Sequence, residues 1–195
     1  MPRVRSGGAS IAVPILVYTV PLALLASANG PVPARTGGFG EMTCHQCHSN
    51  NPLNDPSGQL TLSGIPESYT PGQQYLITVT VAHPQLVRAG FQLSARLATG
   101  DGAGRNAGVF RPVDELTEVV PDDGGRIMYV QHTATGASVP MPGSGRWNFE
   151  WIAPAATTTP ISFHLAANAA NGDGLSRGDF VYTATATSPP AAAAR

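Results

Sequence analysis

The two cysteines of this 195-residue chain lie three positions apart, in the run Cys44-His45-Gln46-Cys47-His48. The run matches C-x-x-C-H, the attachment signature of a c-type haem. Two thiols at this spacing can each add to one vinyl group of a porphyrin, which forms two thioethers. The imidazole of His48 is then close enough to bind the iron from the proximal side. The motif therefore predicts one covalent haem c per chain, held by Cys44 and Cys47, with His48 as the proximal iron ligand.

Two other chemistries fit the same side chains. In an exported protein Cys44 and Cys47 can form a disulfide, and no other cysteine is present to pair with either thiol. Cysteine and histidine are also zinc ligands, although structural zinc sites usually draw their ligands from two separated segments. We weigh haem c above a disulfide, and a disulfide above zinc or another metal.

A sixth iron ligand would have to come from a histidine, a methionine or water. His132 is the candidate distal ligand, because it is in phase with Met128 and Val130 on an expected strand and so points inward. The simpler reading, which we prefer, is a histidine that donates a hydrogen bond inside the fold. The remaining candidates are too close to the motif (Met42, His45), held in a loop (Met141) or expected on the solvated surface (His83, His164).

Residues 1–28 have the pattern of an export signal. Arg3 and Arg5 precede an apolar run from Ile11 to Leu25, and Ala26-Ser27-Ala28 offers a cleavage site between small residues. The run is short and contains two prolines, which argues against a permanent membrane helix, with an uncleaved anchor as the alternative. We therefore expect a periplasmic, secreted or cell-surface protein, and this is where haem c is attached.

Charge and missing motifs exclude several classes of function. The formal net charge is −1, the chain has no lysine, and neither a basic patch nor an acidic run is visible. Nucleic acid is therefore a poor candidate partner, and no strong membrane signal remains after the signal is cleaved. The sequence also contains no G-x-S-x-G, no H-E-x-x-H and no nucleotide-binding loop. We expect that the protein is not an enzyme.

From residue 59 onward the sequence consists of short runs with period two, separated by turn residues. The expected strands are Gln59–Leu62, Tyr75–Val81, Phe91–Leu97, Val109–Arg111, Ile127–His132, Trp147–Trp151, Ile161–Leu165 and Phe180–Ala186. This pattern predicts an all-β, immunoglobulin-like antiparallel β-sandwich over residues 59–186. A Pro/Gly-rich lead-in over residues 29–58 carries the C-x-x-C-H motif, and residues 187–195 are expected to form a disordered tail. Because the lead-in is too short to wrap a haem in helices, the haem must lean on the β-domain, sit in a partner or stay exposed.

Several motifs follow one another in order over residues 38–182. They are Gly37-Gly38, Thr43–His48, Pro71-Gly72, Gly90–Ala95, His132-Thr133, Trp147–Pro154, Phe163–Gly172 and Gly178-Asp179. This order resembles that of the bacterial choice-of-anchor V proteins, which are similar to the reeler domain of reelin. The resemblance implies a reeler-like β-sandwich outside the cytoplasm and, in members with the cysteine motif, a bound haem. It implies no known reaction.

The leading hypothesis is an exported monohaem c-type protein that serves electron transfer or redox sensing, with an unspecified redox protein as its partner. The alternative is a non-catalytic cell-surface or extracellular interaction module in which Cys44 and Cys47 form a disulfide. A third, weaker hypothesis is a peroxide or gas site, which needs an open sixth position on the iron. Arg177-Gly178-Asp179 also spells a cell-adhesion tripeptide, but three residues are weak evidence in any sequence.

Overall fold

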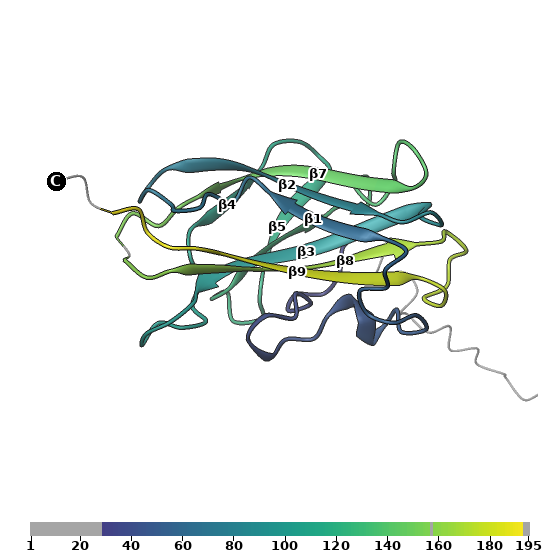
Figure 1. The fold of residues 1–195 in the computed structure, drawn as a ribbon, viewed down its shortest axis with the longest axis horizontal. Coiled ribbons are helices and arrows are strands. Elements are labelled where there is room, and N and C mark those ends of the chain that lie inside the picture. Colours follow the sequence, from purple (N-terminus) through teal and green to yellow (C-terminus); the bar gives the residue numbers. More distant parts are fainter. Residues whose placement is uncertain (1–28, 157, 193–195) are drawn as a thin grey trace, which may run out of the picture.

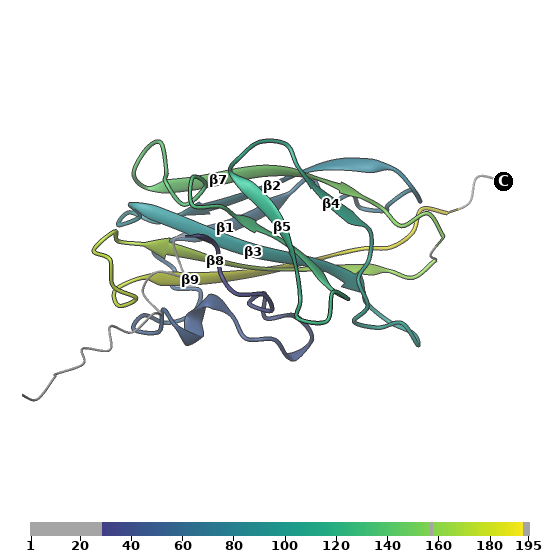
Figure 2. The same cartoon turned by 180° about the vertical axis from the view of Figure 1, so that it is seen from behind.

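The computed structural model describes residues 29–156 and 158–192, and the expected export signal over residues 1–28 lies outside them. Two antiparallel sheets pack face to face (Figures 1 and 2). The four-stranded sheet contains, in spatial order, β1 (Gln59–Ser63), β2 (Gln74–Ala82), β7 (Ser144–Ile152) and β4 (Val109–Pro112). The five-stranded sheet contains β5 (Thr117–Pro121), β6 (Met128–His132), β3 (Arg88–Leu97), β8 (Ile161–Ala170) and β9 (Phe180–Ser188). The expected all-β sandwich is confirmed.

The core between the sheets is formed by the apolar side chains that occupy alternate positions along the strands. Trp147, Phe149 and Trp151 alternate along β7 and are fully buried. Their rings meet those of the opposite sheet, with Trp147 centred 4.8 Å from Phe91 and Trp151 centred 4.9 Å from Phe163. Side chains two residues apart on a strand share one face, so this alternation fixes which face of β7 is buried.

One strand, β5, is additional to those expected, and one boundary differs. β5 lies at the edge of its sheet and pairs only with β6, and its sequence, Thr-Glu-Val-Val-Pro, has no strict alternation that would reveal a strand. At the other end β9 continues to Ser188, and the backbone of Tyr69 then bonds the Pro189 carbonyl at 2.9 Å and the Ala191 N–H at 2.8 Å. The tail expected to be disordered over residues 187–195 is therefore ordered as far as Ala191; residues 193–195 lie outside the described part.

The lead-in packs against the outer face of the five-stranded sheet, on the side away from the other sheet (Figures 1 and 2). The side chains of β3 that point to this face are polar, yet Gln92 and Ser94 are fully buried. The amide oxygen of Gln92 accepts from the Arg35 backbone N–H at 2.7 Å, and its nitrogen donates to the Val32 carbonyl at 3.2 Å. The sandwich thus has a third layer on one side, formed by the segment that carries the cysteines.

Two histidines expected on the surface are partly or fully covered. His164 of β8 lies under the lead-in, with the Phe39 ring centred 5.3 Å away and Gly38 packed directly on its imidazole. His83 is buried and stacks on Phe180 at 3.8 Å. Desolvation by burial lowers the pKa of both imidazoles; for His164 the nearby Arg96 charge adds to the effect.

These two histidines make stability dependent on pH. We expect the free energy of unfolding to fall as pH is lowered from 7 to 5, because the folded state holds both pKa values below the unfolded value of about 6.5. The contribution of the two histidines to the free energy of unfolding is fully present above the pKa of the unfolded chain. It is lost below that pKa, because the unfolded chain then binds protons more readily than the folded chain. Urea titrations at several pH values measure the slope. An unchanged slope in His164→Gln and His83→Gln would contradict the prediction.

Candidate functional site

A cavity of about 620 Å³ lies between the lead-in and one end of the five-stranded sheet, where β3 begins and β6 and β8 end. Its wall is largely apolar, and its volume is in the range of small-molecule and cofactor pockets. The residues that line it include Cys44, Cys47 and His48 of the lead-in, Gly90 and Phe91 of β3, His132 of β6, Asn168 of β8 and Asp179 before β9. The cavity therefore brings together the four residues that the sequence singled out as haem attachment and iron ligands.

A single 3₁₀ turn, Cys44–Gln46, presents the motif to the cavity. Thr43 begins the turn with a capping box, in which its hydroxyl accepts from the His45 N–H at 3.2 Å and the Gln46 side chain accepts from the Thr43 N–H at 2.6 Å. The N–H groups of Cys47 and His48 then return to the Cys44 carbonyl at 3.1 and 3.0 Å. This turn places both cysteines and His48 on the cavity wall.

The two thiols are free and have different surroundings. They form no disulfide in this structure; Cys44 is half-buried and Cys47 is exposed. Burial raises the pKa of the Cys44 thiol to about 12, an effect that outweighs the opposing backbone hydrogen bond. Cys44 is therefore a protonated thiol near neutral pH, with very little of the nucleophilic thiolate.

This difference predicts selective alkylation of the haem-free protein. At pH 8 we expect iodoacetamide to modify Cys47 at least about a hundredfold faster than Cys44, because only the thiolate reacts and burial suppresses that form in Cys44. Mass spectrometry of timed samples measures the two rates. In urea the two rates should become similar, and equal rates in the folded protein would contradict the prediction.

His48 is oriented by a buried carboxylate. Its Nδ1 lies 2.6 Å from Oδ2 of Asp179, a residue that is 1% exposed. When Nδ1–H donates to this carboxylate, the lone pair of the neutral imidazole resides on Nε2. The same carboxylate accepts from the Asn168 side-chain amide and the Asn171 backbone N–H, each at 3.1 Å. Metal-binding histidines usually donate their other ring N–H to a carboxylate or carbonyl, and Asp179 lies in that place at His48.

Sequence reasoning missed Asp179. It lies 131 residues from His48, and the only local patterns that contain it are a Gly-Asp pair and the adhesion-like tripeptide Arg177-Gly178-Asp179. Because the carboxylate is buried and bonded to His48, it is not accessible for recognition of that tripeptide by another protein.

His132, the candidate distal ligand, also lines the cavity. It is buried, and its Nδ1 accepts from the Phe91 backbone N–H at 3.0 Å. Its ring lies against the α-carbon of Gly90, where an added Cβ would be 2.4 Å from the ring. His132 thus makes a hydrogen bond inside the fold, but as an acceptor and not as the donor that the simpler reading expects, and the iron-ligand role stays a prediction.

The side chains considered and set aside as ligands in the sequence analysis are not part of the cavity wall. Met141 is 72% exposed in the loop before β7, and Met42 is also exposed. His45 contacts the Asn51 carbonyl at 2.9 Å through Nε2. Over residues 29–156 and 158–192, no three His, Cys, Asp or Glu side chains gather in a way that could hold a metal ion. In the same part of the chain, no helix is long and apolar enough to cross a membrane.

No family model and no curated protein matches the chain. Among solved structures, the reeler domain of human F-spondin (fragment 1) is 21% identical, with 73% of this chain and 96% of that chain covered and a TM-score of 0.47. The Reelin-N domain of F-spondin is also 21% identical, with 76% and 96% covered and a TM-score of 0.46. A cohesin module from a family 33 glycoside hydrolase of Clostridium perfringens is 9% identical, with 69% and 96% covered and a TM-score of 0.44. These likenesses concern the fold alone: the chain is similar to reeler domains at that level, while the choice-of-anchor V resemblance and the haem stay predictions.

Proposed function

We propose that this protein carries one covalent haem c in the cavity and serves electron transfer or redox sensing outside the cytoplasm. The observation that carries the proposal is the placement of His48. Its imidazole lines a largely apolar cavity beside two free thiols, and the buried Asp179 carboxylate lies 2.6 Å from its Nδ1, a contact that favours the tautomer with the lone pair on Nε2. A disulfide or a solvated loop would not require a carboxylate 1% exposed behind this histidine.

The residues present fit the group. Cys44 and Cys47 would hold the porphyrin through thioethers, and His48 would bind the iron through Nε2. When bound, the haem would supply a one-electron ferric–ferrous couple. Arg35 and Arg88 also line the cavity, and among the described residues neither forms an ion pair, so both can meet the anionic propionates of a haem.

Cys47 is exposed at the edge of the site, which makes this edge accessible to a partner. Electron transfer to and from another protein needs such access, and the partner proposed is a redox protein of the same compartment. His132 is the proposed distal ligand from within the chain, since it lines the same cavity; binding through Nε2 would require its Nδ1–H to donate to the Phe91 carbonyl, 3.2 Å away, in place of accepting from the Phe91 N–H.

A second candidate is a non-catalytic interaction module outside the cytoplasm. The observation in its favour is that the core between the two sheets includes neither cysteine and not His48, so the sandwich can stand without a haem. In this candidate Cys44 and Cys47 form a disulfide, a bond that is not formed in this structure.

The test is export of the full chain from a host with haem c maturation machinery, followed by acid–acetone extraction and a pyridine haemochrome spectrum. We expect a c-type band that stays with the polypeptide. The double variant Cys44→Ser/Cys47→Ser should fold and lose the band, whereas the control His45→Gln, a neighbour that does not line the cavity, should keep it. A colourless wild-type protein with the mass of two oxidised cysteines would refute the haem and leave the second candidate.

A further inference from the structure

We propose that Asp179 is a positioning residue that makes His48 a strongly electron-donating iron ligand and so stabilises the ferric state. This inference rests on the proposed function and specifies it further: the protein would work at low potential, and its partner would be a low-potential electron donor. The argument rests on how Asp179 is held and on what it touches.

Asp179 is fixed by groups from three parts of the chain. Its Oδ1 accepts from the Asn171 backbone N–H and its Oδ2 from the Asn168 side chain, each at 3.1 Å. Its backbone carbonyl accepts from the Asn51 side chain of the lead-in at 3.0 Å. A carboxylate held this way cannot swing away from His48 without losing several buried hydrogen bonds.

The carboxylate faces donors only, and the shortest contact is to the imidazole, at 2.6 Å. Short hydrogen bonds to an ionised acceptor are the strong ones. A carboxylate that accepts from Nδ1–H withdraws positive charge from the ring and raises the basicity of Nε2. A backbone carbonyl in the same place would do so less, because it carries no net charge.

A more basic ligand stabilises the iron state with the higher positive charge. The ferric ion carries one more positive charge than the ferrous ion, so the negative charge at Asp179 favours ferric iron and lowers the reduction potential. The redox partner that this chemistry selects is a donor able to reduce a low-potential haem.

The first variant is Asp179→Asn, which keeps the shape and can still accept from His48 but removes the charge. We expect a higher midpoint potential, with the ferric-to-ferrous ratio at a fixed solution potential lower by roughly tenfold. The matched control is Asp173→Asn, in the same loop but exposed, which should leave the potential unchanged. An unchanged or lower potential in Asp179→Asn would overturn the inference.

A second variant keeps the inference testable if Asp179→Asn does not fold. Asn168→Ala leaves the charge of Asp179 in place and removes an amide group that competes with His48 for Oδ2 at 3.1 Å and lies 3.2 Å from Nδ1 of His48. We expect its potential to shift in the opposite direction, below that of the wild type, and a shift upward would overturn the inference.

A readout without haem separates this inference from the proposed function. In the cofactor-free protein, imidazole ¹⁵N chemical shifts should show His48 as the Nδ1–H tautomer, and Asp179→Asn should weaken that preference. An Nε2–H tautomer in the wild type would overturn the inference by itself. A wild type that never acquires haem would refute the proposed function, and with it the effect on the iron, whatever the tautomer shows.

Discussion

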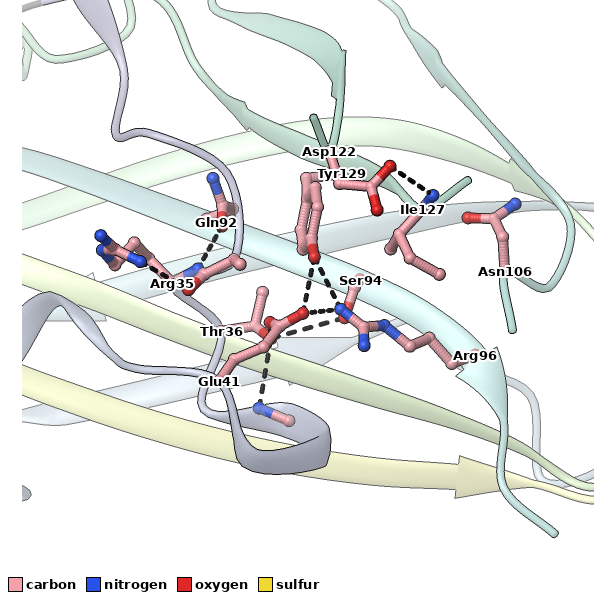
Figure 3. A network of polar contacts seen from close by, with 12 residues as sticks. Arg35, Thr36, Glu41, Gln92, Ser94, Arg96, Asn106, Asp122, Ile127 and Tyr129 are labelled. Carbon is pink, nitrogen blue, oxygen red and sulfur yellow. Dashed lines mark hydrogen bonds and ion pairs between the residues drawn. The ribbon is translucent and has the colours of Figure 1, made fainter. Parts of the chain in front are cut away.

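Replacing Glu41 with alanine is expected to lower the free energy of unfolding by about 3–5 kcal/mol, since it leaves a buried arginine without its counter-charge. Arg96 of β3 is 6% exposed, and its guanidinium pairs with the Glu41 carboxylate (Figure 3). The Tyr129 hydroxyl donates to the same carboxylate at 2.6 Å and the Thr36 hydroxyl at 2.5 Å. Desolvation by burial lowers the pKa of Arg96, so the charge of this guanidinium depends on the groups that pair with it.

The loss should be concentrated in the lead-in. Glu41 and Thr36 belong to the lead-in, whereas Arg96 and Tyr129 belong to the five-stranded sheet. This network therefore links the lead-in to the sheet (Figure 3). Urea unfolding measures the total effect, and hydrogen exchange shows whether the amides around Thr43 and Cys44 lose protection first.

The control is the double variant Glu41→Ala/Arg96→Met, which removes both charges. Because a buried pair replaced by apolar groups is often neutral in stability, the double variant should be clearly more stable than Glu41→Ala. A single variant that costs less than about 1 kcal/mol, or a double variant at least as unstable as the single one, would show that the pair is not effectively buried.

The strands of the core could be predicted because their information is local. Period-two alternation in β2, β3, β7 and β8 identifies the apolar side chains that face the core, and the structure confirms that these are buried. From the same alternation, the polar side chains of β3 (Gln92, Ser94 and Arg96) would be expected to face solvent. These residues are buried because the lead-in covers them, and this contact joins residues about 60 apart in sequence that share no repeating pattern.

The candidate site likewise contains residues that local sequence reveals and one that it does not. Cys44, Cys47 and His48 could be found because their chemistry depends on spacing within five residues. The inward phase of His132 on its strand is also local information, and the structure places its buried ring at the cavity wall. Asp179 could not be found, because its contact with the motif is to His48, 131 residues away in sequence, on a segment that the fold brings to it.

Replacing Gly90 with alanine is expected to displace His132 and to destabilise the fold by about 1–3 kcal/mol. The new Cβ would lie 2.4 Å from Cε1 and 2.7 Å from Nε2 of the buried ring, so the ring must move. Movement breaks the hydrogen bond that the Phe91 N–H gives to Nδ1 at 3.0 Å. The loss should appear even though alanine is otherwise favoured over glycine inside a strand by about 0.5–1 kcal/mol.

Two measurements decide this prediction. Urea unfolding compares Gly90→Ala with Gly124→Ala, a control in an exposed turn where the nearest atom to the new Cβ is the Arg126 side chain at 3.0 Å. The imidazole NMR signals of His132 should shift in Gly90→Ala and stay in place in the control. Since both Gly90 and His132 line the cavity, the displaced ring should also change the spectrum of a bound haem if His132 is its distal ligand. Equal stability of the two variants with an unmoved His132 signal would mean that the ring does not rest on Gly90 in solution.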